Sequence, residues 1–466
     1  MKKLLNWIIP VVFGLVLWFI PTPEGLTPQS WHLFAIFVAT IVGFITQPLP
    51  IGGVSIVVIT VAALTGTLKI GEAISGFANS AIWLIVGAFL FSRGFIKTGL
   101  GKRIAYNLIA AFGSSSLRLA YALALSDLIL APATPSNTAR VGGVIMPITT
   151  SLAKAFGSEP QQGPRKIGSF LMQSIYQVNT ITSAMFQTSM AGNTLVAALA
   201  LQSFGIGITW GDWAMAAIIP GIIALIIMPY FIYKVYPPEI KDAREAQQMI
   251  REELKGLGKM SFQEWVMLGV FVLALVLWAT SQFTQLDATT VAFLGISILL
   301  ATGVLIWDDV KSEKGAWDTL VWMGTLMGFA GFLSKLGFIK WATVLVGGYI
   351  PEGSWIIAFV IAVLINTYSH YVFASLTAHI SAMFVAFSAI AISAGAPPML
   401  TLLMIAFTSN LCMSLTHYAA GPSPVIFNTG YVPQNTWWKL GFFASIINLI
   451  IFMGLGSIWM KAIGMW

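Results

Sequence analysis

The chain has 466 residues, of which 57% are hydrophobic and 9% are charged, and its formal net charge is +7 at pH 7. A chain of this length with a mean hydropathy of +0.85 is not a soluble globular protein, so we expect an all-α polytopic membrane protein. Its basic residues are scattered over the ends of apolar segments and Cys412 is its single cysteine, which argues against nucleic-acid binding, an intrachain disulfide and a cluster of thiol ligands.

The first apolar segment, residues 4–20, follows Lys2 and Lys3. Pro21-Thr-Pro-Glu24 comes next instead of a cleavage site with small residues, so we interpret the segment as a retained helix and not as a signal peptide. Three spans, an amphipathic piece, an interrupted helical pair, a broken span and a further span then follow, at residues 31–46, 56–64, 81–99, 102–111, 116–155, 167–201 and 213–235. The same order recurs after a charged stretch.

This recurrence predicts a division of the chain into four parts. They are a first transmembrane helix and loop (1–30), a first repeat (31–236) with a re-entrant hairpin near 116–155, a cytoplasmic linker (237–264), and a second repeat (265–466) with a re-entrant hairpin near 355–394. Because each repeat has an odd number of spans, we expect two inverted repeats and about 11 transmembrane helices. Most Lys and Arg residues then lie on one side, which the positive-inside rule makes the cytoplasmic side together with the N-terminus.

Two polar stretches interrupt the apolar pattern at equivalent places in the two halves. Pro132–Arg140 reads Pro-Ala-Thr-Pro-Ser-Asn-Thr-Ala-Arg, and Tyr371–His379 reads Tyr-Val-Phe-Ala-Ser-Leu-Thr-Ala-His. The flanking apolar arms are too short to span a bilayer alone, so each stretch is predicted to be the polar tip of a re-entrant hairpin. Free amide groups at broken helix ends favour anions, and matching breaks in two halves are typical of a transporter site.

The chain resembles the divalent anion:sodium symporter family, and more closely its branch of 2-oxoglutarate/malate translocators and citrate/tartrate exchangers. The matching stretches are Ser92–Gly101, Pro135–Arg140, Ser375–His379, Thr416–Tyr418, Gly421–Phe427 and Trp459–Gly464. The resemblance implies inverted repeats, a homodimer built on scaffold domains and an elevator-type movement of the transport domain. We expect the protein in the bacterial cytoplasmic membrane, with membrane lipid around it.

The resemblance also implies the site residues, since in the family each hairpin tip carries Ser-Asn-Thr and each facing helix break completes half of the site. Carried over, the substrate-binding residues are Ser136, Asn137, Thr138 and Asn193 in the first half, and Ser375, Thr377, Gly421, Pro422 and Ser423 in the second. Leu376 stands where the second tip of sodium-coupled members has an amide, and its side chain offers no oxygen ligand. This departure argues against a second sodium site and against sodium coupling.

Positive groups are needed to balance a bound dianion. Arg140, His379 and His417 are the candidates for this charge compensation, together with the N-termini of the half-helices. Two alternatives stay open: Arg140 reaches a cytoplasmic cavity, and each histidine is a neutral imidazole that donates to a backbone carbonyl.

The expected function is sodium-independent exchange of C4–C5 dicarboxylates such as 2-oxoglutarate, malate, succinate and fumarate, with citrate or tartrate as the nearest alternative substrates. A sodium-coupled di/tricarboxylate symporter is the alternative, and an anion channel is a remote one. No His-Glu-x-x-His or Gly-x-Ser-x-Gly motif occurs and Ser375 with His379 is a weak catalytic pair, so we expect no enzyme, no cofactor and no metal site.

Overall fold

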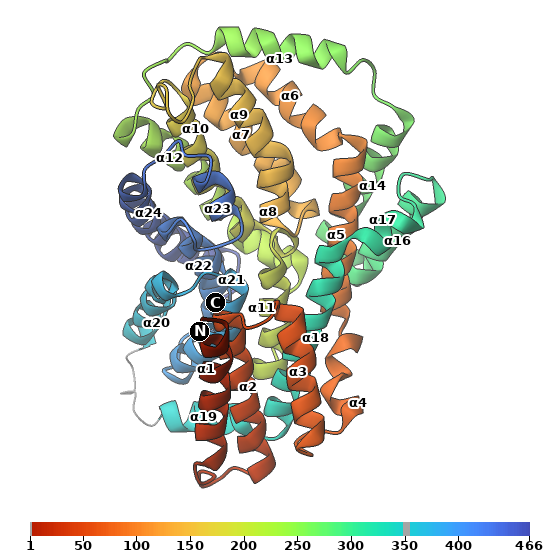
Figure 1. The fold of residues 1–466 in the computed structure, drawn as a ribbon, viewed down its shortest axis with the longest axis vertical. Helices are drawn as coiled ribbons and strands as arrows, with labels where there is room; N and C mark the ends of the chain where they lie inside the picture. Colours follow the sequence, from red (N-terminus) through yellow and green to blue (C-terminus); the bar gives the residue numbers. More distant parts are fainter. Residues whose placement is uncertain (1, 348–354) are drawn as a thin grey trace.

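The computed structural model describes residues 2–347 and 355–466. Within these ranges all the assigned secondary-structure elements are helices (Figure 1). Within them, nine helices are long and apolar enough to cross a membrane, and three shorter apolar helices accompany them. The expectation of an all-α polytopic membrane protein is confirmed. The number of spans stays a prediction, because these helices are identified by length and composition alone.

The first half contains the following helices in chain order. The spans and amphipathic helix are α1 (Lys2–Phe19), α2 (Pro28–Thr46), α3 (Ile51–Leu64), α5 (Ser80–Thr98) and α6 (Leu100–Phe112), with α4 (Ile70–Ala73) and η1 (Ser75–Ala78) before α5. The first hairpin comprises α7 (Ser116–Leu130), η2 (Ala131–Ala133), α8 (Asn137–Arg140), η3 (Val141–Ile145) and α9 (Met146–Ala155). The broken span is α10 (Gly168–Met185), η4 (Gln187–Ser189) and α11 (Ala191–Phe204), and α12 (Trp210–Val235) follows.

The second half repeats this order after α13 (Arg244–Gly256). It begins with α14 (Phe262–Ala279), α15 (Ser281–Thr284), α16 (Ala288–Ala301), α17 (Trp307–Ser312), α18 (Lys314–Lys335) and the amphipathic α19 (Phe338–Gly347). The second hairpin is α20 (Trp355–Ser369), η5 (His370–Val372) and α21 (Leu376–Ser393). The second broken span is α22 (Pro398–Leu411), η6 (Cys412–Leu415) and α23 (Pro422–Phe427), and α24 (Gln434–Leu449), η7 (Ile450–Gly456) and α25 (Ser457–Ala462) end the chain.

In both helical pairs the chain turns at the polar stretch, between η2 and α8 in the first pair and between η5 and α21 in the second. After the tip each returning helix begins on the serine of its motif: the Ser136 hydroxyl accepts from the amide of Ala139 at 3.1 Å, and the Ser375 hydroxyl from that of Ala378 at 3.3 Å. Such a side chain satisfies one of the amide groups that have no partner at a helix start. The serine of each tip is therefore the N-cap residue of the returning helix.

The helices pack in two groups. In one, α5 contacts α16 and α18, and α18 contacts α3; in the other, α10 contacts α7, α12 and α22, and α22 contacts both arms of the second hairpin. Helix α11 contacts α5 and α18 on one side and α21 on the other, so it lies between the groups. At Gly76, a Cβ would come within 1.9 Å of the Gly324 carbonyl oxygen, so η1 approaches α18 this closely only with glycine.

The charged stretch 237–264, which the sequence predicts as a cytoplasmic linker, contains a helix that packs on the rest of the protein. Its helix α13 runs across the top of the view in Figure 1 and packs on α6, with Ala246, Gln247 and Ile250 buried. The Gln247 amide donates to the Ala110 carbonyl at 2.9 Å. In the first turn of α14, a largely buried ion pair joins Glu264 Oε1 to Arg103 Nε at 2.5 Å. The linker thus fastens α6 to the start of the second repeat.

Candidate functional site

A cavity of about 310 Å³ lies where the two hairpin tips meet. It is lined by Pro135, Ser136, Asn137 and Thr138 of the first tip, Ala374, Ser375, Leu376 and Thr377 of the second, Met190 and Ala191, Ala420 and Gly421, and Gln47 and Phe89. The cavity thus joins both tips to both helix breaks. Among these lining residues none has an ionisable side chain.

The cavity is where helix N-termini converge. Ser136, Met190, Ser375 and Gly421 are the N-cap residues of α8, α11, α21 and α23, and all four line it. Helix α8 continues through η3 into α9, so three of the four helical segments are long, and α23 is short. Each long helix places about half a positive charge at its N-terminus. The dipoles of these three long segments therefore supply the positive potential here. Helix α23 adds little, because Pro422 and Pro424 carry no N–H and the Ser423 amide donates to the Ala420 carbonyl at 3.0 Å.

A larger cavity of about 610 Å³ lies elsewhere, between the ends of α11 and α14 and the starts of α5, α12 and α16. Neither hairpin tip lines it, and the two N-caps that follow the helix breaks, Met190 and Gly421, do not line it either. We assign the functional site to the smaller cavity, because both hairpin tips and the N-caps that follow both helix breaks meet only there. Helix N-termini as such do not separate the two cavities, since the N-caps of α5, α12 and α16 line the larger one.

Six of the nine residues expected to bind substrate line the cavity: Ser136, Asn137, Thr138, Ser375, Thr377 and Gly421. Gly421 is required by packing, since a Cβ there would lie 2.1 Å from Thr138 Oγ1. The first tip and the second break are thus in direct contact. Leu376, which replaces the expected amide, also lines the cavity.

The other three residues lie behind the surface of the cavity. The Asn193 amide is fully buried; its Nδ2 donates to the Ser183 carbonyl at 2.8 Å, and its Oδ1 accepts from Asn410 at 2.7 Å. The buried Ser423 hydroxyl is 2.9 Å from the Tyr176 hydroxyl, and Pro422 is the first residue of α23. These contacts hold the breaks together.

Arg140 is 1% exposed and also lies outside the lining. Its guanidinium makes five hydrogen bonds: to Asp127 Oδ1 at 2.9 Å, to the carbonyls of Thr134 at 2.9 Å and Ser189 at 3.0 Å, and to the hydroxyls of Thr182 and Ser183 at 3.3 Å each. Asp127 neutralises its charge. Arg140 therefore joins the first tip to the first break on the side away from the cavity. Its side chain neither reaches a cytoplasmic cavity nor contacts the cavity between the tips.

The two histidines differ from Arg140. His379 holds the position in the second motif that Arg140 holds in the first, and it is fully buried with Nε2 3.1 Å from the Ser369 hydroxyl. His417 Nδ1 accepts from Trp438 Nε1 at 3.0 Å, so this nitrogen carries no proton and the ring is neutral. Neither histidine lines the cavity.

Sequence reasoning missed Gln47 and Phe89, which reach the cavity from α2 and α5. Gln47 ends α2 with a φ of 47° and precedes Pro48. A residue before proline leaves the helical conformation, so this pair was the available signal for a helix end. Phe89 lies in the middle of an apolar span and shows no signal.

The family described as the sodium:sulfate symporter transmembrane region matches residues 1–466, the whole chain. The chain belongs to the divalent anion:sodium symporter family. It is therefore a membrane transporter and not an enzyme, as expected from its sequence.

Similar proteins come from bacteria and plants. The chain is 52% identical over its whole length, and over 97% of the other chain, to YflS of Bacillus subtilis (strain 168), whose name assigns it provisionally to malate transport. It is 47% identical to chloroplastic dicarboxylate transporter 1 of Spinacia oleracea, over 98% of this chain and 81% of that one. The inner membrane protein YbhI of Escherichia coli (strain K12) is 40% identical, over 100% and 98% of the two chains.

Solved structures share the fold. MtrF of Neisseria gonorrhoeae superposes with a TM-score of 0.60 at 13% identity, over 98% of this chain and 94% of that chain. YdaH of Alcanivorax borkumensis superposes with a TM-score of 0.53 at 11% identity, over 99% and 97%.

Proposed function

We propose that this transporter exchanges C4–C5 dicarboxylates, such as malate, 2-oxoglutarate, succinate or fumarate, across a bacterial cytoplasmic membrane without sodium. The observation that carries the proposal is the convergence of four helix N-caps on one cavity whose lining has no ionisable side chain. Backbone amides and hydroxyls at such ends bind carboxylates well. Two tips that face each other suit an anion with a carboxylate at each end.

Similar proteins support the substrate class. YflS is named for malate, and the spinach chain for dicarboxylates. A volume of about 310 Å³ is at the small end of the range for ligand pockets, which suits a short dicarboxylate. Citrate and tartrate are the nearest alternatives, since each also presents carboxylates at both ends.

The absence of sodium coupling follows from the two tips. In the first, the Arg140 guanidinium already binds the carbonyl oxygens of Thr134 and Ser189, which belong to the tip and to the break. A fixed cation thus occupies oxygen ligands that a sodium ion would need. In the second, Leu376 supplies no oxygen where sodium-coupled members have an amide. The competing proposal is a sodium-coupled di/tricarboxylate symporter.

Exchange follows from the charge of the empty site. With no anion bound, the positive charge of the convergent helix N-termini is uncompensated. Moving this charge past the apolar face of α5 that carries Phe89 is costly. A bound dianion removes the cost, so the loaded site crosses and the empty one does not. One-for-one exchange also cancels the membrane-potential cost of about 2.3 kcal/mol per charge per 100 mV. The crossing is proposed as an elevator-type movement of the tip-bearing helices in a homodimer with a cytoplasmic N-terminus and re-entrant hairpins.

The substrate class is tested by competition in proteoliposomes loaded with malate. We expect unlabelled succinate, fumarate and 2-oxoglutarate to inhibit uptake of radiolabelled malate strongly, and acetate, lactate and inorganic sulfate to inhibit it weakly. The matched control is Asn137→Ala protein at equal reconstitution density. Inhibition by sulfate or monocarboxylates equal to that by dicarboxylates contradicts the proposed substrate class.

A further inference from the structure

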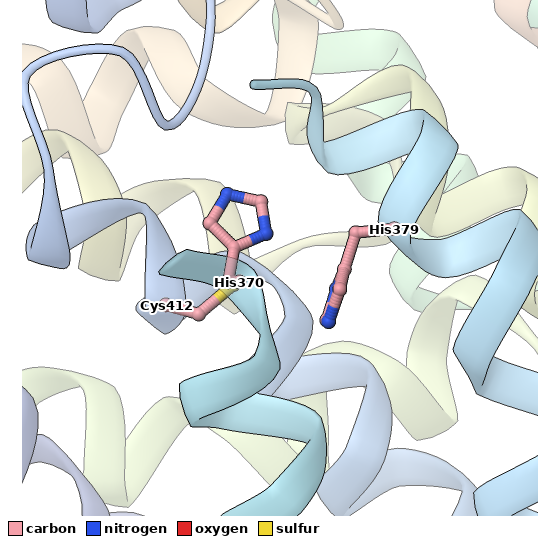
Figure 2. A group of neighbouring side chains, drawn as sticks. All are labelled: His370, His379 and Cys412. Carbon is pink, nitrogen blue, oxygen red and sulfur yellow. The ribbon is translucent and has the colours of Figure 1, made fainter. Parts of the chain in front are cut away.

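Three side chains with metal-binding atoms lie together behind the second tip (Figure 2). His370 belongs to η5, His379 to α21 and Cys412 to η6, and one ligand atom of each lies within 4.8 Å of the other two. All three residues are 0% exposed. The cluster therefore joins both arms of the second hairpin to the second break, and nothing in the proposed transport uses it.

The tautomer of His370 follows from its hydrogen bond. Its Nε2 is 2.9 Å from the carbonyl oxygen of Ala419, and a carbonyl only accepts, so Nε2 carries the proton. The lone pair of the neutral ring is then on Nδ1. Among the residues that the structure describes, this buried Nδ1 has no hydrogen-bond partner.

His379 is held in the same way. The Ser369 hydroxyl donates its proton to the Asn366 carbonyl at 3.0 Å, so it accepts from His379 Nε2 at 3.1 Å. The lone pair of His379 is again on Nδ1, which is buried and finds no hydrogen-bond partner in the described part of the chain. An imidazole that donates through one nitrogen to protein oxygen and keeps the other free has the arrangement of a metal ligand.

Leaving these nitrogens unpaired has a cost. The two rings are edge to face with centroids 4.8 Å apart, and Phe373 packs against His379 at 5.0 Å. A buried polar atom without a partner is destabilising, and two of them lie beside aromatic rings here. Cys412, whose Sγ is 3.3 Å from the Ser409 carbonyl, adds a soft ligand to the same place.

We propose that His370, His379 and Cys412 bind one thiophilic metal ion, Cu⁺ or Zn²⁺. Binding releases one proton, because the Cys412 thiol becomes a metal-bound thiolate while both imidazoles stay neutral. Metal–ligand distances of about 2.0 Å to nitrogen and 2.3 Å to sulfur require the ligand atoms to close by roughly 1 Å. Side-chain rotations supply such a shift.

The net charge of the occupied site differs between the two metals. With one thiolate and two neutral imidazoles, Cu⁺ gives a site without net charge and Zn²⁺ gives a site of net charge +1. No carboxylate belongs to the cluster, and an uncompensated buried charge is costly, so the arrangement favours Cu⁺. In either case the ion fastens η5, α21 and η6 together behind the cavity.

The proposal is tested on the purified full-length protein without substrate, so its outcome is independent of the transport proposal. After equilibration with Cu⁺ under reducing conditions, or with Zn²⁺, and removal of free metal, elemental analysis should find about one ion per chain. Cys412→Ala and His379→Gln should each lose it. His32→Gln is the matched control, because His32 stacks on Trp18 away from the cluster and should leave the ion bound.

Two further measurements test the thiolate ligand directly. Cys412 is the single cysteine of the chain, so an organic mercurial that blocks it should release one equivalent of bound metal per chain. Cobalt substitution should also give a thiolate-to-cobalt charge-transfer band that Cys412→Ala lacks. No bound ion, or equal metal content and no mercurial-dependent release in wild-type and Cys412→Ala protein, overturns the proposal.

Discussion

At the scale of single residues, the two motifs use one position in different ways. Arg140 and His379 both follow the capping serine of their tip by four residues. Arg140 forms an ion pair with Asp127, whereas in the second half Asn366 donates to the Ser409 hydroxyl at 3.2 Å and no carboxylate pairs with His379. The first tip is thus held by a buried charge pair, and the second by neutral groups.

The pair Arg140 and Asp127 should be strongly coupled. Arg140→Ala or Asp127→Ala leaves the other charge buried and unpaired, which costs about 3–5 kcal/mol. We expect each single variant to lower the thermal unfolding midpoint, and the double variant to lose less than the sum of the two. A double-mutant cycle by thermal unfolding in detergent measures this, and additive losses would contradict a direct interaction.

At the scale of elements, the hairpins and breaks were predictable because prolines, short apolar arms and capping serines are local signals. The Pro132 and Pro135 pair identifies the first tip from the sequence alone. The contacts behind the tips were not predictable. Asp127 and Arg140 meet across the hairpin and bind α10, and His370 and Cys412 are 42 residues apart with no recognisable metal-ligand spacing. Such pairings depend on how helices pack, which apolar periodicity leaves open.

Loss of the side-chain amide should have different effects at the first tip (Asn137) and at the first helix break (Asn193). Asn137 lines the cavity, while Asn193 holds the break through backbone carbonyls and Asn410. Asn137→Ala should lower malate exchange at least about tenfold, equivalent to about 1.4 kcal/mol, with little change in thermal unfolding. Asn193→Ala should lower the unfolding midpoint because buried groups lose their partners.

Both readouts are measured on the same preparations, as exchange rate per folded protein and as unfolding midpoint. Wild-type exchange by Asn137→Ala would move the substrate away from the first tip. An unchanged unfolding midpoint for Asn193→Ala would remove the structural role assigned to the break.

At the scale of the whole molecule, the account rests on how charge is distributed. Arg140 is neutralised by Asp127 and His417 is neutral, so the positive potential of the cavity comes from helix N-termini. These helix N-termini are part of the cavity wall, so their charge would move together with the substrate site. Helix α11, which begins at the cavity, also packs between the two groups of helices. Under the proposed exchange mechanism, bound substrate decides whether the site can cross.

The most direct test of this account is malate uptake into proteoliposomes that are either loaded with malate or empty, each with and without external Na⁺. Protein-free liposomes give the background. The account predicts rapid uptake only into loaded liposomes, at a rate that does not change with Na⁺ or with an imposed membrane potential. Robust uptake into empty liposomes that rises with external Na⁺ would contradict it and favour the symporter.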